Sequence, residues 1–100
     1  MTVDLTAFRN ALARLDEGLA RSEREPHDTQ IRDGLIQRFE FTYDLGYKTL
    51  RRCVVEAAAD PSAIDAMTFA EVIRTADEQG LSVADLATMA RSAEHHVAHL

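Results

Sequence analysis

The sequence predicts an all-α protein, and three observations support this class. The 100 residues include two prolines and four glycines, and no segment alternates apolar and polar residues as a strand would. Apolar residues recur every three or four positions, which places them on one side of a helix. Residues that typically begin helices precede these periodic segments. We expect an antiparallel up-and-down four-helix bundle with helices at about 4–24, 28–58, 69–79 and 83–99.

The first predicted helix covers about 4–24. Asp4 can cap it, or place a favourable negative charge in its first turn. Pro26 ends it, because proline disfavours helical backbone in the residue before it. The expected buried line of this helix is Leu5, Phe8, Leu12, Leu15 and Leu19.

The longest predicted helix covers about 28–58, with Asp28 as its N-cap. Gly46 lies beside its apolar line, where a missing side chain would let another helix approach closely. Some 30 residues form a rod of roughly 45 Å, whereas a compact domain of this length has a radius of gyration near 13 Å. We therefore expect an elongated monomer, or a partner that covers part of the rod. The apolar line is Ile31, Leu35, Phe39, Tyr43, Tyr47, Leu50 and Val54.

Two shorter helices are expected after a loop over residues 59–67. Thr68 and Glu71 match the S/T-x-x-E capping box, so the third helix should begin at Phe69, with Gly80 as its C-cap. Ser82 and Asp85 form a weaker version of the same start signal. The apolar line of the fourth helix is Leu86, Met89, Ala90, Ala93 and Val97.

Composition limits the functional classes. The formal net charge of −6 argues against a general nucleic-acid-binding surface. The single cysteine, Cys53, cannot form an internal disulfide, and we expect it to be a small buried residue rather than a reactive thiol. Since no signal peptide or long apolar run is present, we expect a soluble, cytoplasmic protein without membrane contact.

The segment 32–50 carries a family resemblance. It reads Arg-Asp-Gly-Leu-Ile-Gln-Arg-Phe-Glu-Phe-Thr-Tyr-Asp-Leu-Gly-Tyr-Lys-Thr-Leu and resembles the signature helix of the HEPN-type nucleotidyltransferase substrate-binding proteins. The resemblance extends over most of the chain, from Leu5 to His96. It implies one HEPN-like helical domain over 1–100 that partners a minimal nucleotidyltransferase in a prokaryotic two-gene module. Some members are classed as toxins whose antitoxin is the nucleotidyltransferase. Relatives continue past this chain's last residues, so a C-terminal segment is expected to be missing.

The resemblance also points to Arg91 and His96, which match the R-x(4–6)-H motif of HEPN domains. In members classed as metal-independent ribonucleases, it implies that Arg91 holds phosphate and that His96 acts in acid–base catalysis, and both residue types suit these roles. On one ideal helix their side chains would lie about 140° apart, so two copies across a dimer interface could bring them together. Ser92 and Ala98 replace the usual asparagine and tyrosine, which favours a degenerate motif kept for packing.

Further polar residues are weaker candidates. Phe39, Tyr43 and Tyr47 are expected to form core or dimer contacts rather than a cofactor site. His95 and His99 have the spacing of two metal ligands, but no third ligand is evident, so neither metal nor cofactor is expected. Charged residues of the long helix could contact a substrate or partner, or form a solvated face with pairs such as Asp44–Lys48. These candidates are Arg32, Asp33, Arg38, Glu40, Asp44 and Lys48.

Three functional hypotheses result, and the weakest is a structural remnant that is folded and dimeric but has no partner. The first is a non-catalytic binding module that forms a homodimer, associates with a separately encoded minimal nucleotidyltransferase and helps to bind its substrate. The alternative is a metal-independent ribonuclease toxin that uses Arg91 and His96 on RNA. The sequence leaves open whether the ligand is a nucleotide or RNA.

Overall fold

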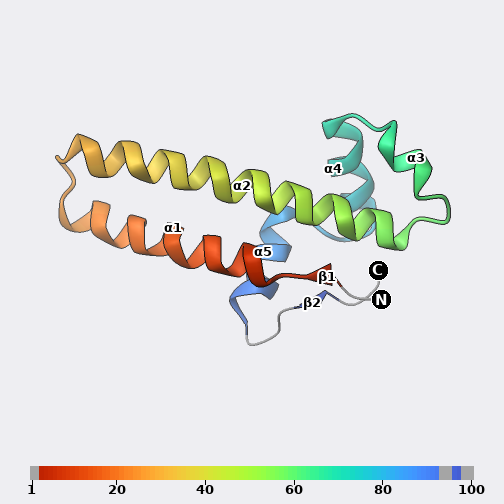
Figure 1. The fold of residues 1–100 in the computed structure, drawn as a ribbon, viewed down its shortest axis with the longest axis horizontal. Helices are drawn as coiled ribbons and strands as arrows, with labels where there is room; N and C mark the ends of the chain where they lie inside the picture. Colours follow the sequence, from red (N-terminus) through yellow and green to blue (C-terminus); the bar gives the residue numbers. More distant parts are fainter. Residues whose placement is uncertain (1–2, 93–95, 98–100) are drawn as a thin grey trace.

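The computed structural model describes residues 3–92 and the backbone of 96–97, and its main feature is a long helical hairpin (Figure 1). Helix α1 spans Thr6–Arg24 and α2 spans Thr29–Ala57. Three shorter helices gather around the C-terminal half of α2: α3 at Ser62–Asp65, α4 at Phe69–Glu78 and α5 at Val83–Arg91. The short strand β1, Val3–Asp4, pairs antiparallel with β2, His96–Val97. The all-α class is confirmed.

The arrangement differs from the expected four-helix bundle, because its helices are very unequal. Helix α2 has 29 residues, whereas α4 has 10 and α5 has 9. At a rise of about 1.5 Å per residue, the two short helices reach along only about a third of α2 each. The described part of the molecule measures 50 × 30 × 18 Å, so the expected elongated shape is confirmed.

Three predicted segments are wrong. Helix α3 occupies part of the expected loop, and the two short strands were not expected. The fourth helix was expected to reach residue 99 but ends at Arg91, and residues 93–95 and 98–100 of that prediction lie outside the described part. Ser92 explains the end of the helix, because both its backbone N–H and its hydroxyl donate to the Met89 carbonyl, at 3.2 and 2.6 Å. Val97 then pairs with Val3.

The first helix begins at Thr6 and not at residue 4, although Asp4 Oδ1 accepts from the Thr6 backbone N–H at 2.8 Å. The predicted starts of the other three helices are confirmed by local hydrogen bonds. The Asp28 carboxylate accepts from the backbone N–H of Gln30 at 3.0 Å and of Ile31 at 3.2 Å. Thr68 forms the expected capping box with Glu71, and Ser82 forms one with Asp85. These bonds satisfy backbone donors that the first helical turn leaves unpaired.

The core lies at one end of the molecule, where the first half of α1 meets the second half of α2, α4 and α5. Gly46 allows this meeting, because a Cβ there would lie 3.0 Å from two ring carbons of Phe8 and 3.0 Å from Val83 Cγ1. The predicted close helix approach is therefore confirmed. The fully buried large side chains of this core are Phe8, Leu5, Leu50, Leu86, Val54, Val72 and Cys53.

The apolar lines of α1 and α2 are buried at this end and become exposed toward the other. Leu50 and Val54 are buried, whereas Leu19, Phe39 and Tyr43 are exposed. The short α4 and α5 cannot cover the half of the hairpin that lies beyond them. Within the described residues, no helix is both long enough and apolar enough to cross a bilayer.

Candidate binding surface

Four of the six aromatic residues gather on one surface, formed by α2 and the start of α4. Phe39, Tyr43 and Tyr47 lie on successive turns of α2, and Phe69 is the first residue of α4. The ring centroids of Phe39 and Tyr43 are 6.3 Å apart, and those of Tyr47 and Phe69 are 4.5 Å apart. The capping box of Thr68 fixes the start of α4, and with it the position of Phe69. We call these four residues the aromatic surface.

The aromatic surface is largely open to solvent. Phe39 is 56% exposed, Phe69 52% and Tyr43 43%. Such large apolar groups are usually buried, and several of them side by side usually mark a contact site. The α2 stripe was expected to be core or dimer contact. In this chain Tyr47 is half-buried against the core, and the apolar line of α2 is fully buried at Leu50 and Val54.

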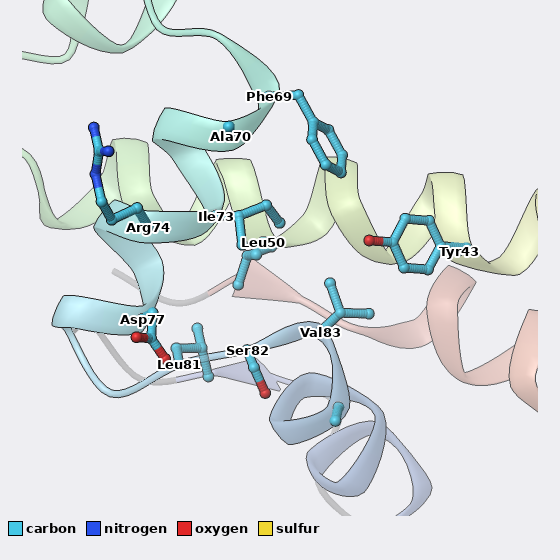
Figure 2. Close-up of a pocket in the computed structure, with 11 residues that line it drawn as sticks. Tyr43, Leu50, Phe69, Ala70, Ile73, Arg74, Asp77, Leu81, Ser82 and Val83 are labelled. Atoms are coloured by element: carbon cyan, nitrogen blue, oxygen red, sulfur yellow. The ribbon is translucent and has the colours of Figure 1, made fainter.

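Two hollows that are lined by both α2 and α4 adjoin this surface. The larger has a volume of about 640 Å³ and extends from Tyr43 and Phe69 to Leu50, Ile73 and Val83. Figure 2 shows Tyr43 and Phe69 facing this space from α2 and α4, with the Tyr43 hydroxyl directed into it. The smaller has a volume of about 350 Å³ and lies beside the rings of Phe39, Tyr43, Tyr47 and Phe69. Both volumes lie in the range of small-molecule sites.

The charged candidates of α2 separate into different places. Glu40 and Asp44 line the smaller hollow, and Lys48 Nζ lies 2.9 Å from Asp44 Oδ2. Arg38 turns toward α1 instead, where its Nη1 donates to the Arg14 carbonyl at 2.8 Å. Arg32 and Asp33 are exposed and line neither hollow at the aromatic surface. The structure therefore brings Glu40, Asp44 and Lys48 together and separates them from Arg38.

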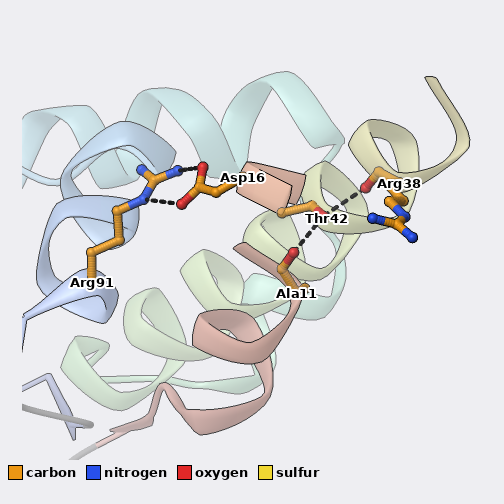
Figure 3. Close-up of polar contacts among 5 residues, drawn as sticks. All are labelled: Ala11, Asp16, Arg38, Thr42 and Arg91. Atoms are coloured by element: carbon orange, nitrogen blue, oxygen red, sulfur yellow. Dashed lines mark hydrogen bonds and ion pairs between the residues drawn. The ribbon is translucent and has the colours of Figure 1, made fainter. Parts of the chain in front are cut away.

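The two residues of the R-x(4–6)-H motif lie on different elements. Arg91 ends α5 and forms a two-pronged pair with Asp16 of α1, at 3.0 and 3.3 Å (Figure 3). His96 lies in β2 opposite Asp4, so the expectation of one helix carrying both residues is wrong. The side chains of His95, His96 and His99 lie outside the described part. Among the residues that are described, no three potential metal ligands form a cluster.

Comparison with known proteins identifies the family. A sequence model described as "Nucleotidyltransferase substrate binding protein like" matches residues 3–99. The chain belongs to this family. No significant match is found among curated proteins or among solved structures. In this member of the family, sequence reasoning missed the contribution of Phe69 to a surface shared with α2. The position of Phe69 at the start of a helix was predictable from the Thr68 cap, but the packing of Phe69 against Tyr47 was not.

Proposed function

We propose that the chain is a non-catalytic binding module that forms a homodimer and associates with a separately encoded minimal nucleotidyltransferase. Family membership supports the link to a nucleotidyltransferase. The observation that carries the proposal is the aromatic surface, where Phe39 and Phe69 are each more than half exposed. Contact sites on proteins are enriched in such aromatic groups, because they remove much apolar area from water when covered.

The uncovered half of the hairpin supports the homodimer. Among the described residues, only α1 and α2 extend beyond α5, where they form a layer of two helices (Figure 1). Leu35 is half-buried there and Leu19 is 44% exposed, and Leu15 is half-buried next to them, where α1 meets α5. Two helices alone cannot enclose a hydrophobic core, but two such hairpins packed face to face would form a four-helix bundle, which can. We therefore assign the dimer contact to this face, defined by Leu15, Leu19 and Leu35.

Sedimentation equilibrium tests the dimer contact. Leu19→Glu places a charge on the proposed contact, and we expect it to raise the dimer dissociation constant at least about tenfold, which corresponds to about 1.4 kcal/mol. Ala20→Glu is the matched control, because Ala20 is an exposed neighbour on the same helix. A wild-type chain that stays monomeric at high concentration, or equal weakening by both substitutions, would contradict the assignment.

Co-purification with the product of the neighbouring gene tests the association. We expect a stable complex at micromolar concentration that Phe69→Ser weakens. Phe41→Ser is the control, because Phe41 is 64% exposed and lies about 200° around α2 from both Phe39 and Tyr43. Failure of the wild-type chain to form any complex would count against the proposed function.

The charged candidate residues of α2 fall into two groups. We assign Glu40, Asp44 and Lys48 to the edge of the partner or substrate contact, since they border the aromatic surface. A contact role for Arg32, Asp33 and Arg38 stays a prediction.

The ribonuclease alternative, with Arg91 and His96 as catalytic residues, also stays a prediction. Phosphate binding by Arg91 would compete with its pair to Asp16. RNA cleavage in the presence of EDTA, lost on His96→Ala, would favour this alternative over the binding module.

A further inference from the structure

The smaller hollow combines aromatic rings with carboxylates. Phe39, Tyr43, Tyr47 and Phe69 line it together with Glu40 and Asp44, and its volume is about 350 Å³. The faces of aromatic rings carry partial negative charge and attract cations that lie within about 6 Å of the ring centroid. Rings also provide apolar contact for methyl and methylene groups. The wall of this hollow therefore suits a group that is both apolar and positively charged.

Glu40 makes the charge of the hollow negative. The Asp44 carboxylate is paired with Lys48 at 2.9 Å, so its charge is largely balanced. The Glu40 carboxylate has no hydrogen bond or ion pair with any other residue that the structure describes. An open carboxylate beside four aromatic rings is attractive to a cation and repels a phosphate or another carboxylate.

We propose that this hollow binds an alkylammonium group, with its carbon atoms against Phe39, Tyr43 and Phe69 and its charge facing Glu40. This inference rests on the proposed role as a binding module and adds the chemical class of the ligand. A neutral apolar ligand would leave Glu40 without a partner at the edge of the contact, so the site favours the cation.

Tyrosine fluorescence gives a direct readout of this site. The chain has no tryptophan and two tyrosines, and both of these, Tyr43 and Tyr47, line the hollow. Tetramethylammonium chloride is titrated against the chain at constant ionic strength. We expect a saturable change in emission with a dissociation constant on the order of millimolar. Neopentyl alcohol, a neutral ligand of the same shape, should bind at least about fivefold more weakly. Equal binding of both ligands, or no saturable change with the cation, would overturn the proposal.

Paired substitutions distinguish binding at this hollow from general effects of mutation on the chain. We expect Phe39→Leu and Glu40→Gln each to weaken tetramethylammonium binding by about three- to tenfold. Phe41→Leu and Glu17→Gln are the controls, because both residues are exposed and neither lines the hollow. Circular dichroism checks that each variant is folded. Loss of binding in the controls equal to that in the site variants would refute the assignment.

A second series distinguishes the two sources of an ammonium group. It compares 1,4-diaminobutane with an end-blocked Gly-Lys-Gly peptide. Tighter binding of the diamine assigns the site to a small molecule, and tighter binding of the peptide assigns it to a lysine side chain of a partner. Binding of neither contradicts the proposal. These titrations use the chain alone, so they can fail while the nucleotidyltransferase complex still forms, and the reverse also holds.

Discussion

Replacing Gly46 by alanine tests how closely the helices meet in the core. The new Cβ would lie 3.0 Å from Phe8 Cε1, Phe8 Cζ and Val83 Cγ1, whereas carbon atoms normally pack about 3.5–4.0 Å apart. Phe8 is 2% exposed, so its ring is enclosed and cannot easily move away. Overpacking of this kind costs about 1–3 kcal/mol, and the better helix propensity of alanine returns about 1 kcal/mol. We expect Gly46→Ala to lower the free energy of unfolding by about 1 kcal/mol.

Gly34 provides a matched control in the same helix. A Cβ at Gly34 would meet nothing within 4 Å, so Gly34→Ala should raise the free energy of unfolding by about 0.5–1 kcal/mol. Urea denaturation followed by circular dichroism measures both variants at one protein concentration, because association changes apparent stability. The difference between the two variants isolates the steric effect, about 1–3 kcal/mol.

A second substitution tests the cause. Phe8→Leu removes the ring atoms that the new Cβ would meet, so Gly46→Ala should destabilise the Phe8→Leu background less than the wild type. If Gly46→Ala stabilised the chain as much as Gly34→Ala, the reasoning about the core would be refuted.

Three further predictions concern a buried thiol, a helix cap and the terminal motif. Burial raises the pKa of Cys53 from 9.0 to about 11, so the unfolded chain loses this proton at lower pH than the folded chain. The stabilisation from the neutral buried thiol is fully present below about pH 9 and is lost as the pH rises toward about 11. Urea denaturation should show a loss of roughly 2–3 kcal/mol in the free energy of unfolding over this range, relative to Cys53→Ala. Equal pH profiles for the two proteins would contradict the prediction. Thr68→Ala should lower the free energy of unfolding by about 1 kcal/mol through loss of the capping box, whereas Thr88→Ala, an exposed position on α5, should change it by less than about 0.5 kcal/mol. If the binding-module proposal is correct, the chain and its His96→Ala variant will show the same background RNA cleavage in EDTA, and a difference between them would support the ribonuclease alternative.

Features that depend on neighbouring residues could be predicted from the sequence. Asp28 caps α2 through bonds to residues two and three positions later, and Thr68 and Glu71 bond each other across one turn. Such bonds need no distant partner, so their residue types predict helix starts. The glycine beside the apolar line of α2 was predictable for a similar reason, since helix periodicity alone places it on the packed side.

Features that depend on distant residues could not be predicted. Helix α5 stops at Arg91, and the chain returns to pair Val97 with Val3. This pairing joins residues that are far apart in the sequence, and no local sequence pattern predicts it. The Arg91–Asp16 pair likewise joins residues 75 positions apart. Arg91, which is predicted to hold phosphate, therefore also links α5 to α1.

The residue pattern by itself determined the helical class, the helix starts, the length of the central rod and the shortage of chain to cover it. Only the tertiary structure decided which part of the apolar line became core and which became surface. The pattern of one helix records that a side is apolar, but burial depends on how far its neighbours extend. Here Leu50 and Val54 are buried in the core that includes residues of α4 and α5, whereas Phe39 and Tyr43, which border the same short helices, stay 56% and 43% exposed. Similar apolar residues along one helix are therefore core at one end and exposed surface at the other.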